Sequence, residues 1–492
     1  MIADLCGLGI TTALCVSLAC GDPAAELVPF VETPSSDSDA YPFSAIDTWE
    51  LSVARIGDLE PIALVSGETG ESLSLDNIAY GSDLVIHLSG RSAGSELAYG
   101  RTCSFDLQRG DRAEPRLFFS RIVRWADGPA LAAERSGAMH GISLRDSRFG
   151  LLWSGHTGGA IDIVDGLLRS SDGEATSLEG ELVNRQGATA TRFGDRVLIV
   201  GGISSSSGDA ARVVEQIVPT ESTVNNQVLQ VDGPALTEHQ SIELVDGSVL
   251  VTGGFSQSSG GEPFVIANAA TKFTLLGGEI VQREIRPGLA FPRTRHEMTR
   301  LGNEVGADVL ITGGRDAAGL GVAQAELYRP LSDTFESIPS AQLSFPRMDH
   351  RAVRLPGGLV LVIGGFAIAS DGGLSPVREL ELYDPVQGQF RSAGILPSRS
   401  GVTGMSVTEL PDGRILLAGG EDIDGEPVNT ALIVRFDPID GVVDLSPTAS
   451  LAVARSHHAA ISLCDGTVLL AGGTASATTR TERYNPPSVN RR

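Results

Sequence analysis

The sequence predicts an all-β protein. Short runs of strand-forming residues such as VLIV, VLVT and LVLV are bounded by Gly, Asp and Pro, which is typical of many short strands. Almost no stretch keeps the 3.6-residue apolar period of an amphipathic helix. Glycine accounts for 59 of the 492 residues, as a chain with many tight turns requires. The formal charge of −24 argues against a nucleic-acid partner, because an acidic surface repels phosphate.

The first twenty residues have the pattern of an export signal. The apolar run LCGLGITTALCVSLA is too short to span a bilayer as a helix and ends directly before Cys20. This arrangement resembles a bacterial lipoprotein signal, which implies a signal peptide over residues 1–20, lipid on Cys20 and a disordered spacer over 21–42. An ordinary secretory signal and a buried strand stay open as alternatives, because the first four residues carry no Lys or Arg.

Residues 43–116 show the alternation of a small antiparallel domain. Apolar and polar residues alternate in the runs at 48–56, 82–90 and 101–107, and Gly-rich turns separate these runs. The pattern predicts a small β-sandwich, similar to an immunoglobulin-like or carboxypeptidase regulatory domain. An irregular N-terminal extension is the alternative.

A repeat begins after this segment. Six apolar strands end in paired glycines, and the pairs follow one another at intervals of 51 to 60 residues. A period near 50 residues built from short strands predicts a β-propeller. We expect these glycines to be structural, because they let backbones approach where a side chain would clash. They are Gly201, Gly202, Gly253, Gly254, Gly313, Gly314, Gly364, Gly365, Gly419, Gly420, Gly472 and Gly473.

Further features recur at the same period. Each unit starts with a segment such as FPRTRHEMTRL (291–301), has a tight turn such as PDG (411–413), and closes its third strand with a segment such as ELYDP (381–385). Together these features resemble the kelch repeat of the galactose-oxidase-like and kelch superfamily. The resemblance covers residues 117–487 and implies a propeller in which each four-stranded blade buries its faces against its neighbours.

The repeat predicts seven blades. A degenerate seventh copy at 133–155 precedes the six regular ones, and the last unit stops at ERYNP without a fourth strand. We therefore expect the strand 117–125 to complete the last blade and close the ring, which removes a free sheet edge. Residues 488–492 would form a tail.

No metal or cofactor is expected. The kelch copper oxidases use tyrosine, histidine and cysteine around copper, but the tyrosines of this chain stand either in structural third-strand positions or before the ring. These are Tyr328, Tyr383 and Tyr484 in the third strands, and Tyr41, Tyr80 and Tyr99 before the ring. The Asp-x-Asp-Gly loop at 420–429 lacks the later ligands of a calcium loop and is interpreted as a solvated connection.

Basic side chains recur where each unit starts, beside the expected central channel. They form a candidate binding ring at the channel mouth, able to attract an acidic ligand. The alternative is that each bonds backbone carbonyls or acids of the next blade, which its recurrence in every unit favours. The ring consists of Arg135, Arg185, His239, Arg293, His296, Arg347, His350, Arg399, Arg455 and His457.

The cysteines outside the signal segment are Cys103 and Cys464. No Cys/His spacing of a zinc site is present. The two could pair in an oxidising compartment, although we expect two free thiols.

These observations predict an exported, lipid-anchored, monomeric propeller that acts without catalysis as a binding or scaffold module. Its partner would be an envelope protein or a glycan, and its place the cell envelope, as an outer-membrane lipoprotein facing the periplasm or the surface. The alternatives are a carbohydrate-active or oxidase-like enzyme with an unrecognised site, and a purely structural surface module.

Overall fold

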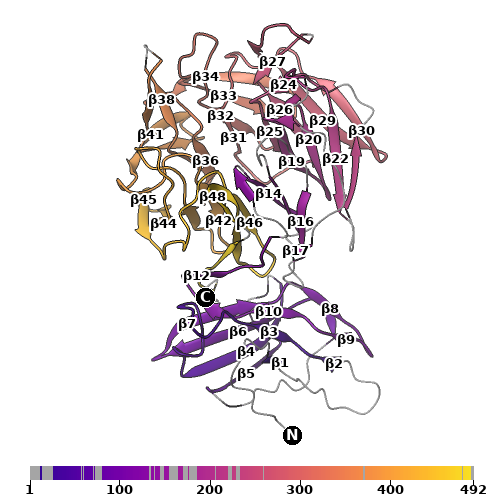
Figure 1. Ribbon diagram of the computed structural model, residues 1–492, viewed down its shortest axis with the longest axis vertical. Helices are drawn as coiled ribbons and strands as arrows, with labels where there is room; N and C mark the ends of the chain where they lie inside the picture. Colours follow the sequence, from indigo (N-terminus) through magenta and orange to yellow (C-terminus); the bar gives the residue numbers. More distant parts are fainter. Residues whose placement is uncertain are drawn as a thin grey trace.

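The computed structural model is all-β (Figure 1). It describes residues 12–13, 26–56, 58, 60–69, 71, 80–131, 135–137, 139–144, 149–154, 164–169, 175–176, 185–204, 207–219, 224–228, 233–258, 260–369, 372–478 and 480–488. Within these ranges no helix is long and apolar enough to cross a membrane. Cys20 and its neighbours lie outside the described residues.

The N-terminal part forms the lower body in Figure 1 and has its own core. Its main sheet has the order β11-β7-β6-β4-β5, with β8 also paired to β6. A second sheet has the order β1-β3-β10, and β2 pairs with β9. The strands are β1 Thr12–Ala13, β2 Glu26–Leu27, β3 Phe30–Glu32, β4 Thr48–Arg55, β5 Ala63–Glu68, β6 Gly81–Ser92, β7 Ser95–Arg101, β8 Phe105–Leu107, β9 Arg112–Ala113, β10 Arg116–Phe118 and β11 Ser120–Arg121.

This part begins earlier than the sequence predicts. Strands β2 and β3 lie inside 21–42, the segment expected to be a disordered spacer, and β3 pairs in parallel with β10. Leu27 and Val31 are buried in the same core as Leu51 and Ile86 of the main sheet. The expected spacer is therefore wrong for residues 26–32, because their apolar side chains are needed to cover the sheet. β1, which pairs with β3, lies within the expected signal peptide.

Seven four-stranded antiparallel sheets follow in the described part of the chain. We number them 1 to 7. Sheet 1 contains β14 Met139–Leu144, β15 Phe149–Ser154, β16 Val164–Arg169 and β17 Ala175–Thr176; sheet 2 contains β19 Thr189–Phe193, β20 Arg196–Val200, β22 Val214–Pro219 and β23 Val224–Val228. Sheet 3 contains β25 Gln240–Glu243, β26 Val249–Thr252, β29 Ala270–Leu276 and β30 Glu279–Glu284; sheet 4 contains β31 Glu297–Arg300, β32 Val309–Thr312, β33 Gln324–Arg329 and β34 Thr334–Gln342.

The remaining sheets follow the same order of strands. Sheet 5 contains β36 Arg351–Arg354, β37 Val360–Ile363, β40 Glu379–Asp384 and β41 Gln389–Ile395; sheet 6 contains β42 Ser406–Glu409, β43 Ile415–Ala418, β44 Ala431–Asp437 and β45 Val442–Pro447; sheet 7 contains β46 Ala459–Ser462, β47 Val468–Ala471, β49 Glu482–Asn485 and β12 Arg124–Asp127. Small ladders link the connections: β13 Arg135–Gly137 with β48 Gly473–Thr478, β18 Arg185–Gln186 with β21 Ile203–Ser204, β27 Phe255–Ser256 between β24 Leu236–Thr237 and β28 Val265–Ile266, and β38 Phe366–Ile368 between β35 Arg347–Met348 and β39 Leu374–Pro376.

Sheet 5 illustrates why these residues fold in this way. All four residues of β37 are buried, as expected for a central strand covered on both faces. Tyr383 is buried and packs beside Phe390 of the next strand, with ring centroids 5.1 Å apart. Sheets 5 and 6 share one apolar core that includes Leu361 and Leu417. A single sheet of this composition could not bury both faces alone, so its stability depends on its neighbours.

The paired glycines stand where adjacent sheets approach most closely. In sheet 4, Gly313 and Gly314 have φ angles of 61° and 95°, a region that favours glycine. A side chain on Gly313 would overlap the carbonyl oxygen of Arg347 and the ring of His350 in the next sheet.

The outer strand of sheet 7 comes from the N-terminal side of the chain. β12 pairs with β49 antiparallel, so that Trp125 faces Tyr484. The pairing strand is 124–127, so that only residues 124–125 of the expected strand 117–125 pair with sheet 7. Residues 116–118 pair with β3, and residues 120–121 pair with β7. The chain thus leaves the N-terminal part as an edge strand of it and enters sheet 7 after two connecting residues.

A disulfide and several polar contacts hold the N-terminal part to sheet 7. Cys103 and Cys464 form a disulfide with their Cα atoms 5.0 Å apart, so the expectation of two free thiols is wrong. Their 361-residue separation hid this proximity. Arg101 donates to the carbonyl of Cys464 at 3.0 Å, and the Asn485 amide donates to the carbonyls of Tyr99 and Ser120. The two parts are therefore cross-linked through the turn between β46 and β47, and Asn485 at the end of β49 adds further contacts.

Removing this disulfide should destabilise the protein markedly. Because the bond closes a very long loop, we expect the Cys103→Ser/Cys464→Ser variant to lose about 2–5 kcal/mol of unfolding free energy. Urea denaturation followed by tryptophan fluorescence measures the loss. Wild-type protein in reductant should unfold at the same urea concentration as the double variant. If the urea midpoint of the wild-type protein is the same with and without reductant, the disulfide does not contribute to stability.

Candidate functional site

A polar cavity of about 420 Å³ lies where the first strands of the sheets converge. Its lining comes from six of the sheets, all but sheet 2, together with the loops that precede the strands. The contributions include Gly141 of β14, Gln240 of β25, Glu297 of β31, Arg351 of β36, Ser406 of β42 and Ala459 of β46. The starts of units that are remote in sequence therefore meet around one cavity.

Four arginines of the expected ring are not exposed at this cavity. Each is buried and forms an ion pair with a buried glutamate in the third strand of its own sheet. The pairs are Arg185–Glu215, Arg293–Glu326 and Arg347–Glu381 at 2.7 Å, and Arg455–Glu482 at 2.8 Å. Their exposed side-chain fractions are between 0% and 3%. These arginines cannot contact a ligand in the cavity, and their role is structural.

The pair in sheet 5 shows what such an arginine does. Arg347 donates to the Glu381 carboxylate at 2.7 Å and to the carbonyl of Gly364 at 3.1 Å. The same carboxylate accepts the backbone N–H of Ser344 at 2.7 Å. Burial lowers the pKa of Arg347, and the charge of Glu381 opposes that shift. The arginine thus joins the loop before the sheet to its second and third strands.

Sheets 3 and 6 lack this arginine–glutamate pair. In sheet 6 this means that the predicted residue Arg399 does not occupy the arginine position. Val402 of sheet 6 occupies the position that Arg347 has in sheet 5. The carbonyl oxygen of each lies against the first of the paired glycines in the preceding sheet. The glutamate position is taken by Leu432. Arg399, expected in the ring, lies three residues before Val402 and is exposed. Arg135 lies in β13, and its side chain is outside the described part.

The buried histidines connect neighbouring sheets. Each one bonds through Nε2 to a hydroxyl of the preceding sheet at 2.8–2.9 Å. The pairs are His239 with Thr189, His296 with Thr252, His350 with Thr312, and His458 with Ser406. Burial lowers the pKa of His239 to about 4 and that of His350 and His458 to about 3, and it holds the pKa of His296 well below its usual value. Neutral imidazoles therefore hold the sheets together, and of the predicted histidines only His457 is exposed.

The residues that precede these histidines by one position share a left-handed backbone, and three of them, Arg295, Asp349 and His457, line the cavity. Glu238, Arg295, Asp349 and His457 have φ angles of 50°, 56°, 53° and 53°, which are left-handed and strained for residues with a side chain. Glycine occupies this position in sheets 2 and 6, as Gly187 and Gly404. We call Arg295, Asp349 and His457, which line the cavity, the mouth residues.

Backbone hydrogen bonds join the mouth residues from sheet to sheet. The N–H of Arg295 donates to the carbonyl of Glu238 at 3.2 Å, and the N–H of Asp349 donates to the carbonyl of Arg295 at 3.3 Å. The N–H of His457 donates to the carbonyl of Gly404 at 2.7 Å. At Arg295, Asp349 and His457 the left-handed turn thus directs one backbone N–H to a neighbouring sheet and places the side chain at the cavity.

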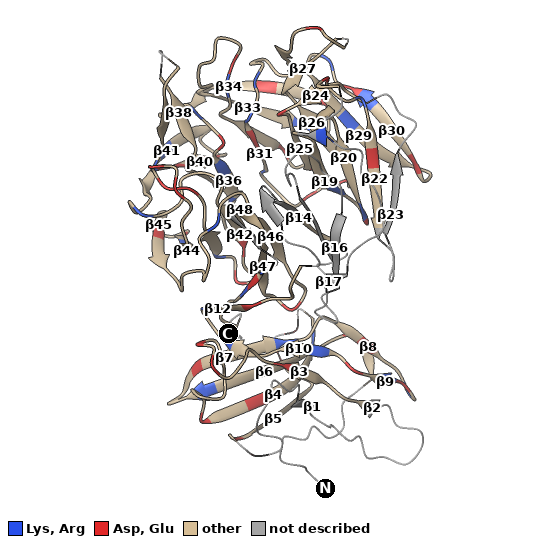
Figure 2. Cartoon of the chain, in the orientation of Figure 1, with Lys and Arg blue, Asp and Glu red and all other residues tan. Residues whose placement is uncertain are grey.

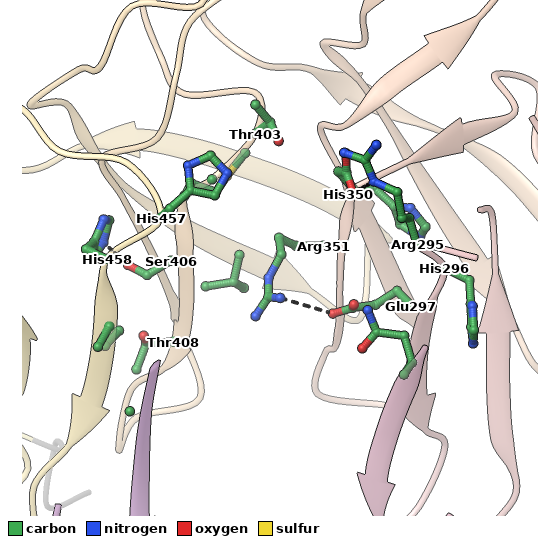
Figure 3. A pocket seen from close by; sticks show the side chains of 18 residues that line it. Arg295, His296, Glu297, His350, Arg351, Thr403, Ser406, Thr408, His457 and His458 are labelled. Atoms are coloured by element: carbon green, nitrogen blue, oxygen red, sulfur yellow. Dashed lines mark hydrogen bonds and ion pairs between the residues drawn. The ribbon is translucent and has the colours of Figure 1, made fainter. Parts of the chain in front are cut away.

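Their side chains pair with one another and with the cavity wall. Arg295 holds Asp349 with two bonds, one of them from Nε at 2.7 Å. Nδ1 of His457 lies 3.4 Å from Oε1 of Glu421. Arg351 extends into the cavity toward Glu297, 3.6 Å away, as Figure 3 shows. Burial raises the pKa of Glu297.

Sequence reasoning missed two of the three mouth residues. Arg295 and Asp349 each stand between an arginine and a histidine, and the residue type at this position changes from unit to unit. The available signal was this variation at one place inside a repeated motif. The residues that recur at the start of each unit gave the stronger pattern, but most of them are buried.

Glycine at the mouth residues should preserve the fold. We expect the variant Arg295→Gly/Asp349→Gly/His457→Gly to be more stable than the matching triple alanine variant. Its unfolding free energy should be higher by about 1 kcal/mol per site, because only alanine keeps the left-handed strain. Chemical denaturation of the two variants checks the difference. Equal stability, or a more stable alanine variant, would mean that the strain is absent.

The loop at 420–429 has a local structural role. The Asp422 carboxylate accepts the N–H groups of Asp424 and Glu426 at 2.9 and 3.1 Å, which closes the loop on itself. Across the described residues no group of three or more His, Cys, Asp or Glu side chains is placed to hold a metal ion.

Comparison with known proteins adds little to this description. No family description and no curated protein matches the chain. Among solved structures, one titled "Structure of YjhT" has 15% sequence identity and a TM-score of 0.48, and the match covers 65% of this chain and 99% of that one.

Proposed function

We propose that the seven sheets close into a kelch-type β-propeller. The support is that first strands of successive sheets touch, from β14 to β19, β25, β31 and β36, and that β46 touches both β42 and β14. The shared core of sheets 5 and 6 joins the remaining neighbours. In such a ring the cavity would be the mouth of the central channel, with β12 closing the circle.

The same proposal makes the protein a non-enzymatic binding module of the cell envelope, anchored by lipid on Cys20. A disulfide suits an oxidising compartment, which supports export. The partner would be an envelope glycan or protein held at the cavity. One observation carries the binding role: charged and titratable side chains occupy strained backbone positions around a shared cavity. Such strain persists where function requires it.

A binding screen tests this role directly. Full-length protein and the triple glycine variant of Arg295, Asp349 and His457 are each immobilised and exposed to envelope glycans and envelope proteins. We expect a ligand that wild type retains and the glycine variant loses, since the variant keeps its backbone but not its mouth side chains. Equal retention by both would place binding elsewhere on the molecule. Metabolic lipid labelling of wild type and Cys20→Ser tests the anchor, and label on the variant would exclude it.

An enzyme acting on a carbohydrate is the second candidate. His457 beside Glu421, facing the same cavity as Glu297, could move protons. A bound sugar recovered chemically unchanged after long incubation favours the binding module, and conversion that the His457→Gln variant loses favours the enzyme.

A further inference from the structure

The charged side chains that line the cavity are already paired within its wall. Arg295 is paired with Asp349, Arg351 with Glu297, and His457 with Glu421. Among the described lining residues, these pairs account for every Asp, Glu, Arg and exposed His side chain. A ligand that enters therefore meets hydrogen-bond donors and acceptors, and each guanidinium among them already has a carboxylate partner.

The rest of the lining has the same character. Thr403, Thr408 and Gln240 add neutral polar groups, and no Phe, Tyr or Trp side chain lies among the described lining residues. The cavity, about 420 Å³, is in the size range of sites for small ligands. Outside the cavity, basic and acidic residues are interspersed over both bodies in the view of Figure 2, and the whole chain carries −24.

We propose that the cavity takes an uncharged, polyhydroxylated ligand, that is, a neutral sugar or the neutral end of a glycan. This inference rests on the binding role proposed above and names its ligand class. A sugar hydroxyl both donates and accepts, so neighbouring hydroxyls can bond to a guanidinium and its carboxylate partner at once. The ion pairs stay intact when such a ligand binds.

A charged ligand would compete with this pairing. An anion that bonds Arg295 or Arg351 would share the guanidinium with Asp349 or Glu297 and would lie close to that carboxylate, which repels it. The negative field of the chain adds to this cost for anions. A cation would face the same problem with the two guanidinium groups.

The pairing predicts how selectivity should change when one partner is neutralised. Asp349→Asn frees Arg295 and should create an anion site, so sugar acids gain affinity relative to neutral sugars. Arg351→Gln frees Glu297 and should favour amino sugars. Glu336→Gln breaks the exposed Arg329–Glu336 pair on β33 and β34, away from the cavity, and serves as the matched control that leaves selectivity unchanged.

The test is an array of neutral oligosaccharides, uronic-acid oligosaccharides, amino-sugar oligosaccharides and acidic peptides, with hits measured by calorimetry on the full chain. We expect wild type to bind a neutral sugar at least about tenfold more tightly than its uronic-acid or amino counterpart. Asp349→Asn should shift the neutral-to-acid ratio about tenfold toward the acid, and Arg351→Gln should shift it toward the amine.

Three results would overturn the ligand class. They are tighter wild-type binding of acids, amines or acidic peptides, no neutral sugar bound at all, or unchanged selectivity in both neutralised variants. The binding role fails separately, when a ligand of any class is retained equally by wild type and by the triple glycine variant of the mouth.

Discussion

The variant Arg347→Val is expected to lose about 3–5 kcal/mol of unfolding free energy, because it leaves the Glu381 carboxylate buried without its partner. The loss should exceed that of an ordinary core truncation, since Arg347 also bonds the carbonyls of Gly364 and Glu379. Glu381→Leu alone should be similarly harmful, because it isolates a buried guanidinium. Urea denaturation of each variant measures these losses.

Sheet 6 of the same chain shows which apolar residues can replace the buried ion pair. Sheet 6 fills the two positions with Val402 and Leu432, both buried in the apolar core shared with sheet 5. We therefore expect the double variant Arg347→Val/Glu381→Leu to recover most of the lost stability, as replacing a whole buried ion pair by apolar residues often does.

The control for this series is Arg399→Val, which changes an exposed arginine and should shift stability by less than about 0.5 kcal/mol. A double variant as unstable as the single ones would show that the pair is needed for more than its mutual neutralisation.

The same residues show what the sequence could and could not predict. The paired glycines, the Asp-Gly turns and the third-strand tyrosines repeat at a fixed period, so short-range pattern was enough to place strands and turns. Whether Arg347 faces solvent depends on Glu381, which lies 34 residues away and whose side chain turns inward only when the sheet has formed. Arg399 was misplaced because the start of sheet 6 is shifted by three residues.

Long separation and local conformation account for the remaining misses. The Cys103–Cys464 bond joins residues in different parts of the molecule, and no local pattern indicates it. Arg295 and Asp349 were missed because the sequence shows that this position varies but not that its φ angle is left-handed. Leu27 was assigned to the expected disordered spacer. It is buried because it covers the main sheet of the N-terminal part, which the local sequence does not indicate.

The protein is expected to lose stability steeply as the pH falls below about 6.5. The pKa of His239 is about 4, and that of His350 and His458 is about 3, whereas an imidazole in the unfolded chain has its usual value near 6.5. Between these values the unfolded chain binds protons that the folded chain cannot accept. Acidification therefore favours unfolding, and the stabilisation is fully present only above the unfolded value.

The expected size of this effect is large because the histidines act together. Each contributes about 1 kcal/mol per pH unit within its window, and with His296 there are four of them. The total approaches the whole stability of a typical domain within two or three pH units. Charge adds to burial at these sites, since Arg347, Arg351 and Arg293 all lower the pKa of His350.

Neutral replacements isolate the contribution of each histidine. His350→Gln can keep a hydrogen bond to Thr312 but cannot be protonated, so the slope of unfolding free energy against pH between 6 and 4 should fall by the equivalent of about one proton. His457→Gln changes an exposed histidine and should leave the slope as in wild type. Denaturant titrations at closely spaced pH values give these slopes. If His350→Gln keeps the wild-type slope, that imidazole does not resist protonation in the folded protein, and the sheets must be held together at this point by packing alone.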